Sequence, residues 1–167
     1  DDLNAAVSSR VSLEGSLRRA IEREEFQLFF QPKADLRSGG VTGVEALLRW
    51  HRPGHGVVPP DRFISVLEDT GMILPVGAWV IRAACEQLAS WDRLGLPPMR
   101  LAVNLSARQF RHLYLASLVE DSLRENSIDP QRLEIELTES LLMEDTETTR
   151  AMLDNFRRMG VRPALDD

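Results

Sequence analysis

The chain has 167 residues, 43% of them hydrophobic, and its 20 basic and 26 acidic residues give a net charge of −6. This size and hydrophobic content are sufficient for one globular domain with a buried core, while the acidic balance excludes binding to polymeric nucleic acid through bulk positive charge. The single cysteine excludes an internal disulfide and a multi-cysteine zinc site, and the lack of a bilayer-length apolar run or a signal peptide predicts a cytoplasmic domain without membrane contact.

The first third of the chain predicts a helix followed by a β-hairpin. Residues 1–12 are polar and weakly patterned, which is typical of a linker from an upstream domain, and Ser12 can cap a helix from about Leu13 to Glu24. Phe26 to Leu36 and Val41 to Trp50 have the composition of strands. The glycine-containing turn between them is so short that the two strands must be antiparallel.

Beyond the hairpin, strands alternate with helices. A loop rich in proline and glycine occupies 53–60, and a short helix is expected over 61–69. We then expect a long amphipathic helix from Val76 to Leu94 that buries Cys85, and a strand from Arg100 to Leu105. Helical structure over 106–126 and a strand from Leu133 to Thr138 should follow. The last elements should be a helix that Asp145 caps and Gly160 ends, and a strand from Val161 to Leu165. The short connections predict parallel strands, so the sequence indicates an α/β fold with five strands packed under helices.

Polar side chains interrupt the apolar strands at Glu45, Asn104, Glu136 and Asp166. Asn104 and Glu136 are 32 positions apart, and Glu136 and Asp166 are 30 apart, which is the length of one strand–helix unit. Equivalent positions of successive parallel strands therefore carry Asn, Glu and Asp. Because parallel strands end at one rim, we expect these side chains to converge there.

Converging carboxylates would repel one another and take up protons unless a cation neutralised them. Three carboxylates and an amide oxygen form an oxygen-only set of ligands, which suits Mg²⁺ or Mn²⁺ rather than zinc. Asp167 adds a carboxylate beside Asp166, so one residue can bridge while its neighbour binds a second ion about 4 Å away, as in phosphodiester hydrolysis. The pattern therefore indicates a site for two hard divalent ions.

Each of these residues also has a purely structural interpretation. A strand glutamate can be solvated at an edge, Asn104 can cap the helix that follows it, and Asp166-Asp167 can form a turn. The repetition at strand ends, at the spacing of one strand–helix unit, favours the metal site over these alternatives.

Several short segments resemble the motifs of a known family. Glu45-Ala46-Leu47 resembles the motif that names the EAL family, and Phe30-Gln31-Pro32 also fits, with Phe30 where the family usually has tyrosine. The later motifs of the family are similar to Val103-Asn104-Leu105-Ser106, to Glu136-Leu137-Thr138-Glu139-Ser140 and to Ala164-Leu165-Asp166-Asp167, the last being the start of a double-aspartate motif. The chain thus resembles the N-terminal part of an EAL domain over 13–167.

This resemblance implies a modified (β/α)8 barrel, similar to a TIM barrel, with an antiparallel first strand and only about five of its strands in this chain. It implies hydrolysis of cyclic di-GMP to linear pGpG, dependent on Mg²⁺ or Mn²⁺ and opposed by Ca²⁺. It also implies a homodimer and an upstream sensory or GGDEF-type domain in the same parent chain.

Carried over residue by residue, the resemblance also assigns the metal site. The first ion would be held by Glu45, Asn104, Glu136 and Asp166, and the second would face Asp166 and Asp167. The ions would activate a water for attack on phosphorus, so Glu45, Asp166 and Asp167 are the expected catalytic residues.

The resemblance further implies substrate contacts. Arg49 shares one face of its strand with Glu45 and would contact a substrate phosphate, the alternative being a surface ion pair. Gln31 would lie near a guanine, or would only satisfy backbone groups beside a proline. Glu139 would anchor an active-site loop, or would serve as a carboxylate at a helix start.

The family pattern continues beyond the aspartates with a glycine-rich loop and with strands that bring a lysine, a glutamate and a glutamine, none of which is in these 167 residues. We therefore expect this segment alone to be inactive and the full-length parent to be the phosphodiesterase. The alternatives are a non-catalytic module that binds cyclic di-GMP and a regulatory half-barrel that acts through dimer contacts. The presence of all five metal-site residues favours the enzyme.

Overall fold

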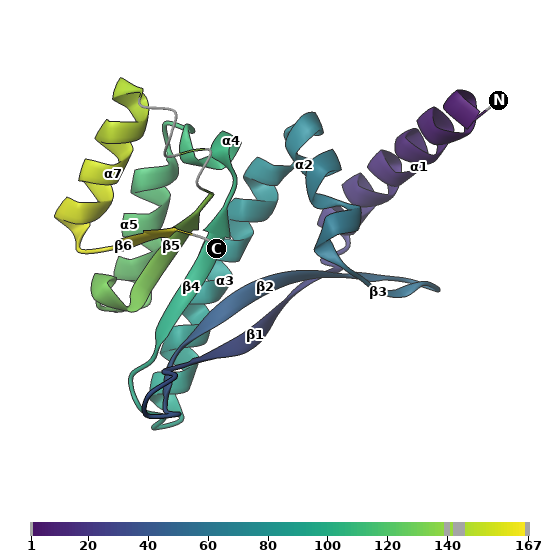
Figure 1. Ribbon diagram of the computed structural model, residues 1–167. Helices are drawn as coiled ribbons and strands as arrows, with labels where there is room; N and C mark the ends of the chain where they lie inside the picture. Colours follow the sequence, from purple (N-terminus) through teal and green to yellow (C-terminus); the bar gives the residue numbers. More distant parts are fainter. Residues whose placement is uncertain (1, 139–140, 142–145, 166–167) are drawn as a thin grey trace.

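The computed structural model describes residues 2–138, 141 and 146–165, and their strands form one mixed sheet (Figure 1). The strands are β1 (Phe26–Ala34), β2 (Val41–Arg52), β3 (Gly56–Val58), β4 (Arg100–Leu105), β5 (Leu133–Leu137) and β6 (Arg162–Leu165). Their order is β1-β2-β4-β5-β6, with β3 paired to β2 off this path. Because β1 is antiparallel to β2 while β2, β4, β5 and β6 run parallel, the predicted α/β fold with an antiparallel first strand is confirmed.

The loop of the β1–β2 hairpin is organised by Asp35. Its Oδ1 accepts hydrogen bonds from the backbone amides of Ser38 at 2.7 Å and Arg37 at 3.0 Å. These bonds hold the pKa of the Asp35 carboxyl below its ordinary value, and the bond from Ser38 has the largest effect. Gly39 then takes a φ of +68°, which glycine adopts without strain, so the turn is as short as the sequence predicts.

β3 lies within the stretch 53–60 that was expected to be a loop, so this part of the prediction is wrong. Gly54 and Gly56 adopt φ values of +75° and +74°, which turn the chain back onto β2. The residues of β3 then pair with Trp50, His51 and Arg52. A strand of three residues is too short to show an alternating pattern, which is why composition indicated a loop.

A layer of helices covers one face of the sheet (Figure 1). It consists of α3 (Ile73–Arg93), α5 (Leu115–Glu125) and α7 (Glu147–Met159), with α3 against α5 and α5 against α7. The connections hold α2 (Ile64–Thr70), α4 (Ala107–Phe110) and the 3-10 turns η1 (Pro60–Arg62) and η2 (Pro130–Arg132). Cys85 of α3 is fully buried, and this burial raises the pKa of its thiol to about 12, which confirms it as a core residue.

The N-terminal helix begins earlier than predicted. α1 runs from Asp2 to Glu22, so most of the presumed linker over 1–12 is helical and the predicted cap at Ser12 is wrong. Ser12 lies inside the helix, where its carbonyl accepts from the Ser16 hydroxyl at 3.0 Å. Residues 8–12 of the helix are exposed, Val11 to 65%, so this part of the helix packs no apolar face against the core. The domain boundary near residue 13 stays a prediction.

The predicted cap of the last helix is also wrong. Thr146 is the N-cap of α7, because its hydroxyl accepts from the Thr149 backbone amide at 3.2 Å, whereas Asp145 lies outside the described residues. At the other end, Gly160 adopts a left-handed φ of +87° and ends the helix as predicted.

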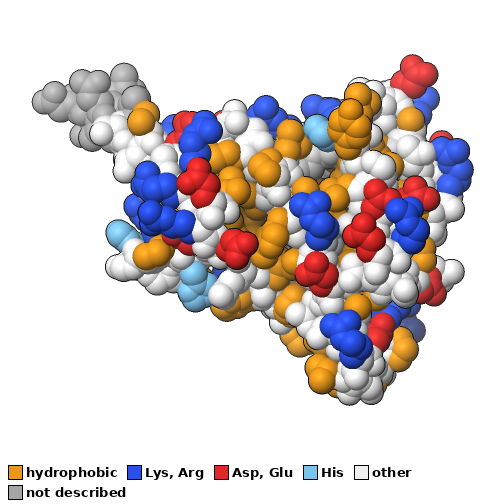
Figure 2. All heavy atoms as spheres, turned by 180° about the vertical axis from the view of Figure 1, so that it is seen from behind, with side chains coloured by type: hydrophobic (Ala, Val, Ile, Leu, Met, Phe, Trp, Pro, Cys, Tyr) orange, Lys and Arg blue, Asp and Glu red, His pale blue; other side chains and the backbone are white. Residues whose placement is uncertain are grey.

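The surface seen from behind carries acidic and basic side chains intermingled, with apolar side chains between them (Figure 2). Among the described helices none is by itself long and apolar enough to cross a membrane, although α2 and α3, which meet at a bend of 119°, meet the criteria of length and composition when taken together.

Candidate active site

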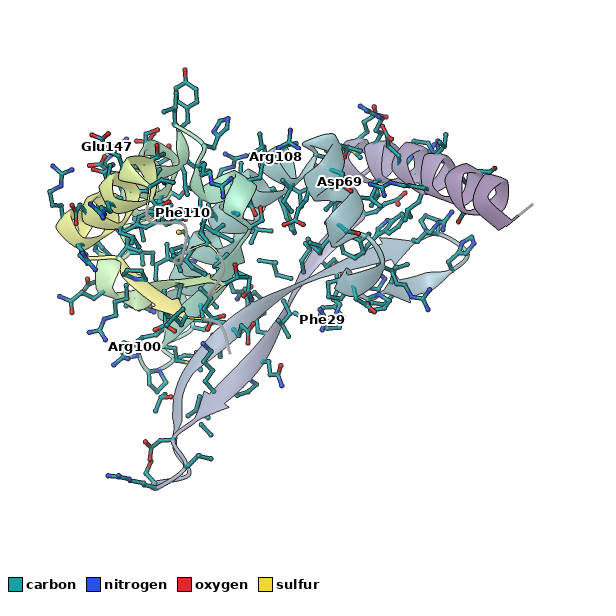
Figure 3. The ribbon with its side chains drawn as sticks, turned by 45° about the horizontal axis from the view of Figure 1, so that its top comes forward. Phe29, Asp69, Arg100, Arg108, Phe110 and Glu147 are labelled. Carbon is teal, nitrogen blue, oxygen red and sulfur yellow. The ribbon has the colours of Figure 1, made fainter. Side chains whose placement is uncertain are left out.

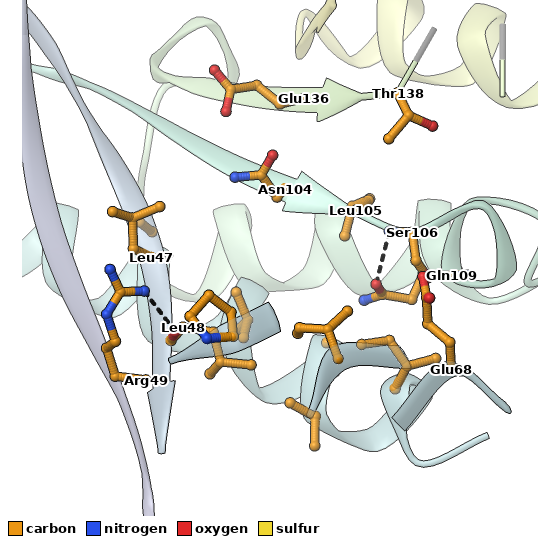
Figure 4. Close-up of a pocket in the computed structure, with 17 residues that line it drawn as sticks. Leu47, Leu48, Arg49, Glu68, Asn104, Leu105, Ser106, Gln109, Glu136 and Thr138 are labelled. Carbon is orange, nitrogen blue, oxygen red and sulfur yellow. Dashed lines mark hydrogen bonds between the residues drawn. The ribbon is translucent and has the colours of Figure 1, made fainter. Parts of the chain in front are cut away.

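Four of the predicted site residues lie side by side across four neighbouring strands. Gln31 of β1 pairs with Glu45 of β2, and Asn104 of β4 pairs with Glu136 of β5. The Nδ2 atom of Asn104 donates a hydrogen bond to Oε1 of Glu45 at 2.7 Å, which joins the two pairs. We call Gln31, Glu45, Asn104 and Glu136 the polar row, and Figure 4 shows Asn104 and Glu136 projecting to the same side of the sheet.

The polar row is exposed at its β1 end and buried at its β5 end. Gln31 and Asn104 are exposed and Glu45 is half-buried, but Glu136 is only 6% exposed. A carboxylate so deeply buried requires a positive partner, because an uncompensated buried charge is costly. The buried end of the row is therefore where a cation has the greatest effect.

Arg49 lies on the same face of β2 as Glu45, four residues further along. Its guanidinium carbon is 5.8 Å from the centre of the Phe29 ring, and its Nη1 donates to the carbonyl of Leu48 at 2.9 Å. Within the described residues Arg49 makes no salt bridge, so the alternative interpretation as a surface ion pair has no support there. Its cationic group therefore lies on the face of the sheet that carries the polar row.

A cavity of about 330 Å³ adjoins Arg49 and the polar row (Figure 4). Asn104 and Glu136 line one part of it together with Arg49. Much of the remaining wall is apolar and includes Leu47, Leu48, Pro60, Ile64 and Val76. A cavity with apolar walls and a few placed polar groups is suited to a planar organic group that carries an anion.

The chain that follows Asn104 is fixed by a capping box. Ser106 Oγ accepts from the Gln109 amide at 3.3 Å, and Gln109 Oε1 accepts from the Ser106 amide at 3.0 Å. Ser106 rather than Asn104 therefore caps α4, so the structural interpretation of Asn104 as a helix cap is wrong.

Arg108 of α4 lies beside the end of α2, where its Nη1 donates to the Asp69 carbonyl at 3.4 Å (Figure 3).

Lys33 and Glu134 also belong to this face and were not among the predicted site residues. The Lys33 ammonium donates to Oε1 of Glu136 and, at 3.4 Å, to Oε1 of Glu134. Burial alone would lower the pKa of Lys33, but the hydrogen bond and charge of Glu136, reinforced by Glu134, raise it above its ordinary value. Both residues keep the period-two spacing, two positions after Gln31 and two before Glu136, which is the signal that could have found them.

Three predicted site residues cannot be placed. Asp166, Asp167 and Glu139 lie outside the described residues. Among those described, no group of three or more His, Cys, Asp or Glu side chains forms a complete metal site. The donors that do come together are the carboxylates of Glu45 and Glu136 and the amide of Asn104, an oxygen-only set whose chemistry fits a hard divalent ion.

The model of the EAL domain family matches residues 14–167, and the chain belongs to this family. The bifunctional diguanylate cyclase/cyclic di-GMP phosphodiesterase MucR of Pseudomonas aeruginosa is 39% identical over 165 residues, which are 99% of this chain and 24% of MucR. The cyclic di-GMP phosphodiesterase PdeR of Escherichia coli is 36% identical over 166 residues, 99% of this chain and 25% of PdeR. The chain thus spans about a quarter of the length of these relatives.

A solved structure shares the fold. The PaMucR phosphodiesterase in complex with c-di-GMP superposes with a TM-score of 0.89 at 40% identity, over 93% of this chain and 63% of that chain. The predicted resemblance to the EAL family and the predicted TIM-barrel-like fold are confirmed.

Proposed function

We propose that this chain is part of a phosphodiesterase domain that hydrolyses cyclic di-GMP to linear pGpG. The observation that carries the proposal is the polar row, in which Glu45, Asn104 and Glu136 come from three adjacent strands of the sheet. The names of MucR and PdeR, and the c-di-GMP in the PaMucR complex, support the substrate.

The proposal includes two Mg²⁺ or Mn²⁺ ions, with Ca²⁺ opposing the reaction. Glu45, Asn104 and Glu136 would hold them together with Asp166 and Asp167. Ions of this kind lower the pKa of a bound water and offset the charge that develops on a phosphate. Asn104 donates to Glu45 through Nδ2 and so orients that carboxylate, while its Oδ1 keeps the lone pairs that an ion requires.

The substrate contacts follow from the cavity beside the polar row. Arg49 would bind a phosphate of cyclic di-GMP, since a guanidinium matches phosphate oxygens in charge and geometry. The apolar wall would receive a guanine base, and Gln31 would hydrogen-bond near a guanine from the exposed end of the row. These contacts would hold the phosphodiester against the carboxylates.

For the whole protein, we propose a cytoplasmic homodimer with an upstream sensory or GGDEF-type domain. The name of MucR, a bifunctional diguanylate cyclase/cyclic di-GMP phosphodiesterase of which this chain matches about a quarter, supports the upstream domain of the cyclase type.

The central test is Glu45→Ala in the full-length protein, with release of pGpG measured in Mn²⁺. Loss of this carboxylate should reduce turnover to below about 1% of that of the wild type while the circular dichroism spectrum is retained. Turnover that survives the substitution would remove Glu45 from the metal site. Wild-type protein that binds cyclic di-GMP without cleaving it would instead establish the non-catalytic module.

Arg49→Ala provides a comparison on the same face of the same strand. It should raise KM more than it lowers kcat, because the phosphate contact is lost while the carboxylates stay in place. An unchanged KM would remove Arg49 from the substrate site.

A further inference from the structure

Lys33 bridges two strands to reach the buried end of the polar row. It lies on β1, and β2 and β4 separate that strand from β5, which carries Glu134 and Glu136. The Lys33 side chain is 36% exposed, whereas that of Glu136 is only 7% exposed. The ammonium is therefore the cation that neutralises this buried carboxylate among the described residues.

Small residues under the lysine make this reach possible. Gly43 pairs directly with Lys33, and Ala102 pairs with Glu134, so the position next to each charge carries little or no side chain. The backbone is tight at Gly43, where an added Cβ would be 3.0 Å from the carbonyl oxygen of Arg100. Lys33, Gly43, Arg100, Ala102 and Glu134 are among the residues that line a small hollow of about 130 Å³.

Glu134 gives Lys33 a second partner close by. Its Oε1 is 3.4 Å from the ammonium, and its side chain is 22% exposed, so a charge there is far better hydrated than at Glu136. A lysine is a point charge on a flexible stem and can exchange one carboxylate for the other with little movement. The same face thus offers the Lys33 ammonium two carboxylate partners, the buried Glu136 and the better hydrated Glu134.

We propose that Lys33 is a resident counter-ion that competes with the divalent cation for Glu136 and withdraws to Glu134 when the cation binds. This inference rests on the proposed function, because it requires that Glu136 be a metal ligand. The ammonium stabilises the ion-free protein and would repel a divalent ion on the same carboxylate. Lys33 thereby sets the metal affinity of the site without touching the substrate.

The consequence follows from linkage between ion binding and stability. A group that stabilises only the ion-free state lowers the affinity for the ion, and removing it raises that affinity. In Lys33→Met the aliphatic stem remains and the charge is lost. We expect the variant to melt at a lower temperature without metal and to bind Mn²⁺ about three- to fivefold more tightly.

The experiment titrates Mn²⁺ into the full-length protein, with ion binding followed by calorimetry and thermal unfolding recorded with and without Mn²⁺. Arg157→Met is the matched control, because it makes the same change in net charge at an exposed residue of α7 that pairs with Asp154. It should leave Mn²⁺ affinity unchanged. A purely structural role of Lys33 would lower both melting temperatures equally and leave the affinity unchanged, which would overturn the proposal.

Glu134→Gln is a second variant, which removes the position to which Lys33 withdraws. It should weaken Mn²⁺ binding about twofold with Lys33 present and have a smaller effect in the Lys33→Met background. Equal effects in both backgrounds would mean that Glu134 acts through its own charge, and would overturn the exchange. If wild type and Glu45→Ala both fail to bind Mn²⁺, the proposed metal site fails and this inference fails with it. Mn²⁺ binding that depends on Glu45 but not on Lys33 overturns the inference alone.

Discussion

β5 carries the two faces of the sheet on alternate residues, and the faces differ in chemistry. Leu133, Ile135 and Leu137 are fully buried members of the apolar core. Glu134 and Glu136, between them, project to the opposite face, where they meet Lys33. One strand of five residues therefore separates the part of the molecule that stabilises the fold from the part that carries charge.

The difference between the faces shows where fold and function can be separated. Parallel strands covered by helices are usually continuous apolar runs, so an acidic residue in such a strand has a cost. Substitutions on the helix-covered face should act mainly on the free energy of unfolding, whereas those on the face of the polar row should act mainly on ligand and ion binding. The predictions below test this division, beginning with the largest effect on stability.

Ile135→Ala should lower the free energy of unfolding by about 3 kcal/mol, because Ile135 is fully buried and its truncation leaves a cavity in the core. The matched substitution is the neighbouring Glu134→Gln, which removes a partly exposed charge and should cost less than about 1 kcal/mol. Urea denaturation monitored by circular dichroism measures both. Similar losses for the two variants would show that the faces contribute equally to stability and would contradict the division.

Gly77→Ala tests the packing of the helix layer against α4. A Cβ at this position would lie 1.6 Å from Nε2 of Gln109, so the glutamine would have to leave its site and the capping box with Ser106 would be lost. We expect a net loss of about 1 kcal/mol even though alanine is the better helix former.

The control for this prediction is a double-mutant cycle with Gln109→Ala. Once the glutamine is absent, Gly77→Ala should stabilise the protein by up to about 1 kcal/mol, since only the gain in helix propensity remains. A loss of the same size in both backgrounds would mean that Gln109 is not the reason for the glycine.

Much of the site could be predicted because its spacing is periodic. Asn104 and Glu136 are one strand–helix unit apart, so the parallel register that pairs them follows from the chain. Glu45 and Arg49 are an even number of residues apart on a strand, which fixes their common face. Patterns of this kind survive in the fold because each helix returns the chain to the neighbouring parallel strand.

The parts of the fold and of the site that could not be predicted depend largely on contacts between distant segments of the chain. The ion pair of Lys33 with Glu136 joins residues 103 positions apart. No spacing rule in the sequence connects β1 of the antiparallel hairpin with β5, since β2 and β4 lie between them in the sheet. β3 needed the turn geometry of Gly54 and Gly56. Residues 8–12 of α1 are exposed, so no buried face marks them as helical. Sequence patterns identify elements that bury a face, and they miss those that do not.

The smallest expected effect concerns the ion pair that fastens α3 to the start of β5. Arg132 donates to Oδ2 of Asp92 at 2.7 Å and, through Nε, to the carbonyl of Met99 at 3.1 Å. The hydrogen bond from Arg132 holds the pKa of Asp92 below its usual range. A carboxyl whose pKa is lowered in the folded state stabilises the protein above its unfolded pKa, and this stability is lost as the pH falls through the folded pKa.

Asp92→Asn should therefore lower the melting temperature slightly at pH 7, and the difference from wild type should shrink below about pH 4 and vanish in stronger acid. Asp35, whose pKa is also lowered, titrates in both proteins and cancels in the comparison. In an Arg132→Met background the substitution should have no effect at any pH, because the partner that lowers the pKa is gone. A difference in melting temperature that persists in acid would show that Asp92 acts through packing at the end of α3. The ion pair with Arg132 would then not contribute to the stability of the protein.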